Sequence, residues 1–441
     1  MTKNNLIFEA DDNKYIFFGN HLTIYKIEDK EIENHLNGIN EIEEIDEFFK
    51  NANNETGKIN IAKGADDPLN AIILVTSNDC NLRCKYCYAV DFKMDKHNYM
   101  DFNIAKHSVD YLLKQSPDIE SYGIVFFGGE PLINFKLIQK VVNYSITEIV
   151  NKRGKGVGFS MTTNGTILTD KIISFLKQYN FSITISIDGA KEDHDKNRVY
   201  KNGDGSYEQI IKNIDKLKKA DINFELRATI SSDANLFDTI KFLENKKISF
   251  GFGLTMNTKN RDKNITEFEQ DSITKLRKEY TAIVDYFYEK INNNEKIYCQ
   301  NIMSSLTSIE TRQGKVVNCT ASRNTISIDA NGEVLPCQNF QNYPEIHKQS
   351  ILSVNSAIKP VFIAPNVEDL LDCNSCFAKY FCAGGCFFEK YNNNSDINIP
   401  PSSKCVVTKI QWEYMLKLYV KLQNSDLLKE SIFIKQENFY V

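Results

Sequence analysis

The spacing of hydrophobic and polar residues changes near residue 70 of the chain. Before this point, short alternating runs predict strands, and the patterns that follow them predict helices. The strands are expected at 6–9, 15–18 and 22–27, and the helices at 29–36 and 39–49. Strands followed by helices on this scale predict a small winged-helix-like module.

From residue 71 onward, apolar strand-like runs alternate with amphipathic helical stretches. We expect strands at 71–77, 122–127, 157–162, 181–187, 223–230 and 248–255, and helices near 102–115, 132–151, 168–179, 207–219, 233–245 and 267–292. Six successive strand–helix units predict an α/β fold with a parallel sheet and right-handed crossovers. The periodicity alone also permits a doubly wound sheet.

The length of the chain predicts more than one domain, because 441 residues exceed one compact core of ordinary size. The expected units are an N-terminal module at 1–66, an α/β domain at 67–298, a cysteine-rich domain at 299–415 and a C-terminal extension at 416–441.

Composition and charge narrow the functional classes. A content of 42% hydrophobic and 25% charged residues is typical of a soluble globular protein. The net charge is -5 and no long basic run occurs, so nucleic acid is not an expected partner. The chain opens without an apolar signal segment, and its apolar runs are too short to span a membrane. We therefore expect a cytoplasmic protein.

The eleven cysteines are unevenly distributed. Three lie in the stretch Cys80-Asn-Leu-Arg-Cys84-Lys-Tyr-Cys87 directly after a strand, Cys299 stands alone, and seven follow between 319 and 405. In a reducing compartment they indicate metal binding rather than disulfides. Zinc usually takes cysteines in pairs and needs four ligands. Three thiolates on one loop instead suit three irons of a [4Fe-4S] cluster, which leaves the fourth iron without a protein ligand.

This cysteine spacing, with Tyr86 just before the last cysteine, resembles the radical S-adenosylmethionine (SAM) superfamily. The resemblance implies that the cluster at Cys80, Cys84 and Cys87 binds SAM through its open iron and releases a 5'-deoxyadenosyl radical. It also implies a partial (β/α)6 barrel whose active site lies at the carboxyl ends of the strands.

The loops after the strands carry the other residues that this resemblance assigns. Gly128-Gly129-Glu130 follows the second strand and is similar to the motif that binds the methionyl amino group of SAM. Asn164 would reach the ribose, and Ser186 with a strand-five arginine, here Arg227, would hold the methionyl carboxylate. The implied cofactor contacts are Tyr86, Gly128, Gly129, Glu130, Asn164, Ser186 and Arg227. A simple turn remains the alternative for Gly-Gly-Glu and for Asn164, and the roles of His194 and Arg198 stay open.

The C-terminal cysteines resemble the SPASM domain of peptide-modifying radical enzymes. The pattern comprises Cys319, Gly332 and Cys337 with four residues between them, Cys373-x2-Cys376-x5-Cys382-x3-Cys386 and Cys405. The resemblance implies one auxiliary [4Fe-4S] cluster on Cys373, Cys376, Cys382 and Cys405 and another on Cys319, Cys337 and Cys386, three clusters in all. Two zinc ribbons are the alternative. Either Cys299 supplies the missing eighth ligand, or one iron is open to the thiolate of a substrate cysteine.

The family resemblance favours an enzyme that modifies a ribosomal precursor peptide. We expect it to abstract hydrogen and form a cysteine thioether crosslink of the sactipeptide or ranthipeptide type, with an electron donor such as flavodoxin or ferredoxin. The module at 1–66 would bind the leader of the precursor, or it would be a structural cap. The alternatives are a carbon–carbon crosslink, sulfatase (formylglycine) maturation and a non-catalytic metal scaffold. Sulfatase maturation is disfavoured because Gln338 stands where those enzymes carry an aspartate base.

Overall fold

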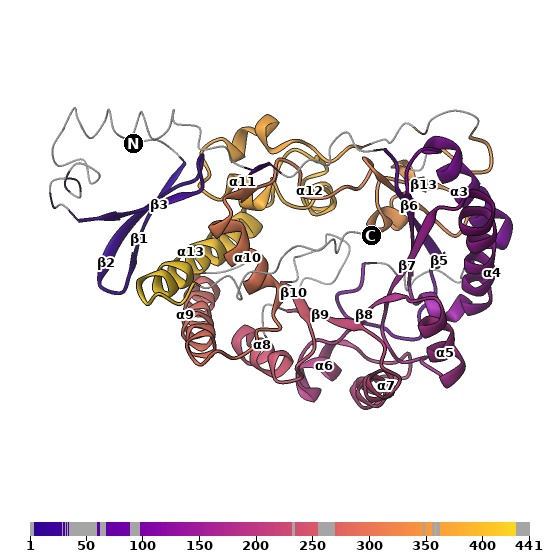
Figure 1. The fold of residues 1–441 in the computed structure, drawn as a ribbon, viewed down its shortest axis with the longest axis horizontal. Helices are drawn as coiled ribbons and strands as arrows, with labels where there is room; N and C mark the ends of the chain where they lie inside the picture. The colour runs from indigo at the N-terminus through magenta and orange to yellow at the C-terminus, as the bar shows by residue number, and fades with distance from the viewer. Residues whose placement is uncertain are drawn as a thin grey trace.

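The structure is a computed structural model, and it describes residues 4–28, 30, 32, 34, 60–61, 68–88, 98–231, 234–254, 270–346, 349–354, 358 and 362–428. A curved eight-stranded sheet forms its centre (Figure 1). The strands of this sheet are β5 (Ala71–Ser77), β6 (Ser121–Gly128), β7 (Gly156–Thr163), β8 (Ser182–Ser186), β9 (Phe224–Ile230), β10 (Phe250–Leu254), β12 (Thr325–Ile328) and β13 (Val334–Leu335).

The order of the strands is β10-β9-β8-β7-β6-β5-β12-β13. Strands β5 to β10 pair in parallel, as the alternating sequence pattern predicts. Their bounds lie within two residues of the predicted ones. Because the strands are parallel, the loops that follow them meet at one edge of the sheet.

The helices of the barrel lie on the outer side of this sheet (Figure 1). They are α3 (Phe102–Gln115), α4 (Phe135–Ser145), α5 (Asp170–Gln178), α6 (Lys191–Asn197), α7 (Tyr207–Lys219) and α8 (Leu236–Glu244), and α9 (Gln270–Asn292) follows β10. Amphipathic spacing identified all of them except α6. That helix reads Lys-Glu-Asp-His-Asp-Lys-Asn and buries only His194, so it has no apolar stripe to detect.

One predicted helix is divided in the structure. The stretch 132–151 comprises the 3-10 helix η1 (Pro131–Asn134), α4 and the π-helical segment η2 (Ile146–Asn151). Asn134 donates its side-chain amide to the carbonyls of Thr76 (3.1 Å) and Met100 (3.0 Å), which ties the junction of η1 and α4 to the barrel.

Aromatic side chains fill the layer between the sheet and its helices. The rings of Phe126, Phe159 and Phe181 lie with their centroids 5.5 to 6.5 Å apart. Each is almost fully buried, and burial of such a side chain contributes roughly 1.5–3 kcal/mol. This packing joins β6, β7 and the start of β8.

The N-terminal module contains the three predicted strands as an antiparallel sheet of β1 (Asn5–Ala10), β2 (Asn13–Phe18) and β3 (Thr23–Ile27). The helices predicted at 29–36 and 39–49 lie outside the described residues apart from 30, 32 and 34. The Phe17 ring stacks on Phe381 at 5.6 Å, and Phe381 stacks on Trp412 at 4.0 Å. The sheet is therefore anchored to the C-terminal third of the chain.

The C-terminal third combines short elements with one long helix. They are α10 (Gln300–Glu310), β11 (Gln313–Gly314), which pairs with β4 (Asn60–Ile61), η3 (Gln338–Asn342), η4 (Pro344–Ile346), η5 (Val367–Asp369), η6 (Leu371–Cys373), α11 (Lys379–Cys382), α12 (Phe387–Asn394) and α13 (Ser402–Asn424). Strand β12 pairs in parallel with β5, so this region continues the barrel sheet. The boundary expected after residue 415 falls inside α13. Among the described helices, none combines the length and apolar character that crossing a bilayer requires.

Candidate functional site

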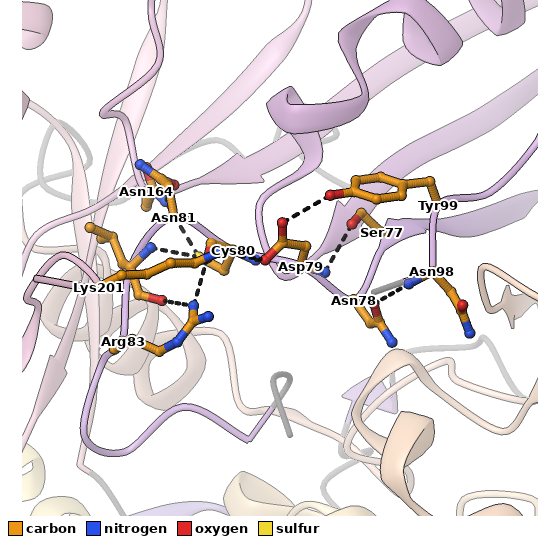
Figure 2. A network of polar contacts seen from close by, with 11 residues as sticks. Ser77, Asn78, Asp79, Cys80, Asn81, Arg83, Asn98, Tyr99, Asn164 and Lys201 are labelled. Atoms are coloured by element: carbon orange, nitrogen blue, oxygen red, sulfur yellow. Dashed lines mark hydrogen bonds and ion pairs between the residues drawn. The ribbon is translucent and has the colours of Figure 1, made fainter. Parts of the chain in front are cut away.

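The first cysteine loop begins at the end of β5, where Asp79 anchors it (Figure 2). Asp79 Oδ1 accepts hydrogen bonds from the backbone N–H of Cys80 (2.8 Å) and from Lys201 Nζ (3.1 Å), and Oδ2 accepts one from the Tyr99 hydroxyl (2.9 Å). Its own N–H donates to Ser77 Oγ at 2.9 Å. These contacts fix the direction in which the loop leaves the strand.

The three thiols of this loop converge. Burial raises the pKa of Cys80, and the negative charges of Glu130, Cys84 and Cys87 raise it further. Burial likewise raises the pKa of Cys84 to about 11, partly offset by the cation of Arg198. Thiols that are this hard to ionise alone need a metal to become thiolates. Because iron–sulfur clusters take cysteine thiolates as ligands, the three converging sulfurs fit such a cluster.

Nitrogen donors surround these sulfur atoms. The backbone N–H of Leu82 lies 3.4 Å from Cys80 Sγ, Asn164 Nδ2 lies 3.7 Å from the same sulfur, and Arg198 Nη1 lies 3.9 Å from Cys84 Sγ. Such donors stabilise negative charge on sulfur. No three His, Cys, Asp or Glu side chains in the described ranges converge at the spacing of a single-ion site.

Glu130, after β6, is fully buried and ties two loops together. Its carboxylate accepts hydrogen bonds from the Thr163 hydroxyl (2.7 Å) and from the backbone N–H groups of Asn164 (2.8 Å) and Leu132 (3.1 Å). Burial raises its pKa to about 7 although these hydrogen bonds oppose the rise. Its predicted role toward an amino group stays a prediction.

The glycines before Glu130 have a packing role. A Cβ at Gly128 would lie 2.3 Å from the carbonyl oxygen of Ser77, and one at Gly129 would lie 2.2 Å from that of Asp79. Gly128 also has a positive φ of 141°. The resemblance implied that both glycines contact SAM, and in the structure the backbone of Ser77 and Asp79 takes up the room beside them.

Asn164 is bonded to neighbouring side chains. Its Nδ2 donates to Asn81 Oδ1 at 2.9 Å, and its Oδ1 accepts from the N–H (2.9 Å) and hydroxyl (2.6 Å) of Thr166. The residue therefore connects the cysteine loop to the loop after β7, and its contact with a ribose remains a prediction.

A second carboxylate, Asp188 after β8, was not assigned from the sequence. Its Oδ2 accepts hydrogen bonds from the Tyr86 hydroxyl and from Arg198 Nε (2.9 Å), and its Oδ1 accepts one from the N–H of Thr229 (2.9 Å). The Arg198 guanidinium lies 5.5 Å from the centre of the Tyr86 ring. Arg198, left open from the sequence, thus orients Tyr86 beside the cysteines. The only signal was the position of Asp188 at a strand end.

His194 is a buried structural residue in this arrangement. Its Nδ1 accepts the N–H of Asp188 (3.3 Å), so Nε2 is the protonated nitrogen that faces Ser206 Oγ at 3.0 Å. Burial and the nearby Arg198 cation lower its pKa to about 4. The imidazole is therefore neutral at physiological pH.

Ser186 and Arg227 are neighbours on adjacent strands, and their role toward a carboxylate stays a prediction. They are paired in the register of β8 and β9. A Cβ at Gly251 would lie 2.8 Å from Arg227 Nη1, and one at Gly253 would lie 3.2 Å from Nη2, so the two glycines make room for the guanidinium. Partial burial lowers the pKa of Arg227. Among the described residues, no side chain forms an ion pair with it, which leaves the cation available to an anionic ligand.

The C-terminal cysteines lie in two groups, and the clusters that the resemblance implies for them stay a prediction. Burial and the negative charges of Cys405, Cys373 and Cys376 together raise the pKa of Cys382 to about 12, so these four lie together. Burial raises the pKa of Cys337, with Cys386 and Cys319 adding to the effect, so these three form the second group. The all-sulfur donors of each group fit an iron–sulfur cluster.

Cys299 lies apart from both groups. It is fully buried in the barrel core, directly before α10, and its backbone forms an isolated parallel β-bridge with Phe250 of β10. Its N–H donates to Glu244 Oε2 at 3.1 Å, and burial raises its pKa to about 12. Cys337 and Cys386 belong to a separate apolar cluster. The group of three thus gains no fourth cysteine.

Tyr88 lies between the first cysteine loop and the group of three. Burial raises the pKa of its phenol, and the thiolates of Cys87, Cys337 and Cys386 raise it further. Its ring packs 5.9 Å from that of Phe388. Sequence reasoning missed this residue, which directly follows the cysteine motif and connects the two sites.

Comparison with known proteins agrees with this geometry. Residues 74–236 match the family model of the radical SAM superfamily. An uncharacterized protein of Methanocaldococcus jannaschii is 39% identical over 171 residues, which are 38% of this chain and 56% of the relative. The radical SAM cyclopropyl synthase TigE of Paramaledivibacter caminithermalis is 26% identical over 384 residues, 81% of this chain and 75% of the synthase.

Two further matches concern sulfatase maturation and the fold. A cysteine-type anaerobic sulfatase-maturating enzyme of Clostridium novyi is 29% identical over 172 residues, 38% of this chain and 45% of the enzyme. Native anSMEcpe with bound AdoMet superposes with a TM-score of 0.69 at 20% identity and covers 81% of this chain and all of that one. The fold likeness therefore extends beyond the barrel.

Proposed function

Because this chain carries a radical SAM domain, we propose that it is an enzyme that abstracts hydrogen from a ribosomal precursor peptide and joins a cysteine sulfur to carbon as a thioether. The radical SAM assignment is the premise, and the peptide substrate and the thioether are the proposal.

The observation that supports the thioether is the ligand count of the group at Cys319, Cys337 and Cys386. All eleven cysteines of the chain are placed, and the nearest remaining candidate, Cys299, is held in the barrel core. A cluster with four irons on three cysteines has one position without a cysteine ligand. A substrate thiolate is a ligand of the right chemistry for that position.

The residues at the barrel edge suit a SAM site. A [4Fe-4S] cluster on Cys80, Cys84 and Cys87 would, with SAM, supply a 5'-deoxyadenosyl radical. Arg227 and Ser186 would hold the carboxylate of the methionyl group, and Glu130 would face its ammonium. Asp188 and Arg198 fix the ring of Tyr86 beside these groups. Because Glu130 is fully buried, its attraction to a positively charged group would be stronger than in water.

The substrate is expected to lie near Tyr88, between the two cysteine sites. Thioether formation from a thiolate and a carbon radical releases one electron, and clusters at the C-terminal cysteines would supply the capacity to accept it. The residue after Cys337 is Gln338, whose amide cannot take up a proton. This arrangement suits a reaction that needs no carboxylate base at that position.

Carbon–carbon bond formation is the second candidate. It is favoured by the similarity to TigE, whose name describes a cyclopropyl synthase and which matches 81% of this chain. Sulfatase maturation has less support, because Gln338 follows Cys337 where the resemblance places an aspartate base.

The peptide partner is expected to bind in two places. Its leader would add a strand to an edge of the β1-β2-β3 sheet, and its core would enter the barrel mouth. A small electron-transfer protein such as flavodoxin or ferredoxin would reduce the first cluster.

Mass spectrometry of the product tests the proposal. The reconstituted enzyme is incubated with SAM, a reductant and cysteine-bearing peptides encoded beside its gene, and the product is then alkylated. A thioether removes two hydrogens and leaves one cysteine unalkylated, whereas a carbon–carbon link removes two hydrogens and leaves every cysteine reactive. An aldehyde in place of a cysteine would instead assign sulfatase-type chemistry.

A further inference from the structure

A lysine is buried between the two C-terminal cysteine groups. Lys390 of α12 is 1% exposed, and its Nζ has no hydrogen-bond partner among the described residues. An unpaired ammonium in a protein interior is strongly unfavourable unless an anion compensates it. The described protein atoms supply no such anion at hydrogen-bonding distance.

The local backbone places this ammonium between the groups. Lys390 follows Cys386 by one helical turn, and its N–H bonds to the Cys386 carbonyl (3.1 Å). Between Cys382 and Cys386 the chain makes a left-handed turn through Ala383, Gly384 and Gly385. A Cβ on Gly384 would lie 3.3 Å from Lys390 Nζ, so this glycine leaves the space that the lysine head occupies.

Thiols of both groups surround the lysine. Burial lowers the pKa of Lys390, whereas the thiolates of Cys373, Cys382, Cys386 and Cys405 all raise it. In turn, the lysine is the strongest influence after burial on the thiol of Cys373, and it acts against the rise in that pKa. Three of the four cysteines belong to the group of four, so the lysine is more closely associated with that group.

Protonated thiols cannot balance this charge, but a cluster can. A [4Fe-4S] core of charge 2+ with four cysteine thiolates carries two net negative charges, and it gains a third on taking up one electron. A fixed cation nearby favours the reduced form because it stabilises the more negative state.

We propose that Lys390 is a positioning residue whose buried charge raises the reduction potential of the cluster at Cys373, Cys376, Cys382 and Cys405, and that of its neighbour at Cys319, Cys337 and Cys386 to a smaller degree. The step concerned is [4Fe-4S]2+ plus one electron giving [4Fe-4S]+. The electron comes from the substrate when its new bond forms, a source that rests on the proposed function. The higher reduction potential of the cluster at the group of four directs the electron away from the substrate and toward that cluster.

The test is a redox titration of the Lys390→Met protein, monitored by electron paramagnetic resonance. It uses the reconstituted full chain with Cys80, Cys84 and Cys87 replaced by alanine, so that only C-terminal clusters contribute. We expect the midpoint potential of the cluster at the group of four to fall by about 59 mV. At the wild-type midpoint, the ratio of reduced to oxidised cluster would then fall about tenfold, because one electron is transferred. The matched control is Lys404→Met, which removes a partly exposed lysine that also acts on Cys382. Its midpoint should move much less.

Every outcome decides the proposal. The proposal is overturned if the Lys390→Met protein has the same midpoint potential as the protein that retains Lys390. It is also overturned if Lys404→Met shifts the midpoint as much as Lys390→Met does. If Lys390→Met loses auxiliary iron, the Lys390→Arg protein is measured: restored iron supports a need for the cation, and iron that stays lost overturns the charge argument. The titration contains no peptide, so its result is independent of the product analysis that tests the proposed function. A shifted midpoint together with a carbon–carbon product would support the role of Lys390 and reject the thioether. A thioether product with unshifted midpoints would do the reverse.

Discussion

The two cysteine-bearing regions of the chain are assembled by different forces. Around Cys80, hydrogen bonds and ion pairs dominate: Asp79 alone holds the backbone of Cys80, Lys201 and the hydroxyl of Tyr99. Polar contacts of this kind depend on the charge of each partner. We therefore expect this region to be sensitive to single polar substitutions and to pH.

Around Cys337, aromatic packing dominates instead. The ring of Phe340 lies 5.1 Å from that of Phe388 and 5.6 Å from that of Phe387, and the three are almost completely buried. These rings hold cysteines that are distant in sequence, and their contacts carry no charge. In this protein, cysteines close together in sequence are held by hydrogen bonds and ion pairs. Cysteines far apart in sequence are held by a packed aromatic core.

Replacing Cys80, Cys84 and Cys87 together by alanine should have the largest effect and should separate the two regions. We expect SAM cleavage to fall to background while iron drops from about twelve to about eight per chain, because the C-terminal groups keep their clusters. The measurements are 5'-deoxyadenosine yield and iron content after reconstitution. Undiminished 5'-deoxyadenosine would refute the assignment, and loss of all iron would show that the regions depend on each other.

The buried, neutral His194 in the polar network of the barrel predicts that the stability of the protein depends on pH. Its pKa of about 4 lies below the unfolded value of 6.5, so its stabilisation is complete above pH 6.5 and is lost as the pH falls toward 4. The loss amounts to about 3 kcal/mol at most. Unfolding of the protein and of a His194→Gln variant between pH 7.5 and pH 5 measures it. Equal slopes for the two would contradict this assignment.

Replacing Arg227 by methionine should weaken SAM binding about 10- to 100-fold, because a hydrogen bond to a charged group contributes about 1.5–3 kcal/mol. Calorimetry on the reconstituted protein measures the affinity. Arg277→Met is the control, since that arginine pairs with Glu413 on the surface at 2.9 Å. Unchanged affinity in the Arg227 variant would remove Arg227 from the site.

Deleting residues 1–66 should reduce precursor affinity about tenfold, the effect of losing part of a strand-addition site. Substrate-independent SAM cleavage should remain nearly intact. A Phe17→Ala protein is the control, because it loses the stacking on Phe381 but keeps the strand edges. Equal affinity with and without the segment would make it a structural cap.

The smallest effect is expected for Cys299→Ala. Iron content and crosslinking should be unchanged, with a stability loss of about 1 kcal/mol for the truncated buried side chain. Metal analysis and thermal unfolding check this. A loss of iron would mean that Cys299 is a ligand and would favour the carbon–carbon product.

The alternating barrel was predictable because its strands and helices are encoded locally. A buried strand such as β5 and an amphipathic helix such as α3 each carry a clear period. The helix α6 was not predictable, since its stability comes from the burial of His194 against Ser206 rather than from an apolar stripe.

The site was predictable where chemistry fixes spacing. The grouping of the C-terminal cysteines came from the family resemblance that their pattern carries, whereas Asp188, Tyr88 and Lys390 were missed. Asp188 and Tyr88 owe their roles to neighbours from distant segments, Tyr86 for Asp188 and Cys386 for Tyr88. No local pattern marks them, because their surroundings exist only in the folded chain.

The parallel pairing of β12 with β5 has a consequence for biosynthesis. Residues 325–328 close the edge of a strand that is made some 250 residues earlier in the chain. Until they arrive, the apolar β5 presents unpaired backbone groups, and such edges promote aggregation. Barrel fragments that end before β12 should therefore be poorly soluble, and the last third of the chain serves the first as an intramolecular chaperone.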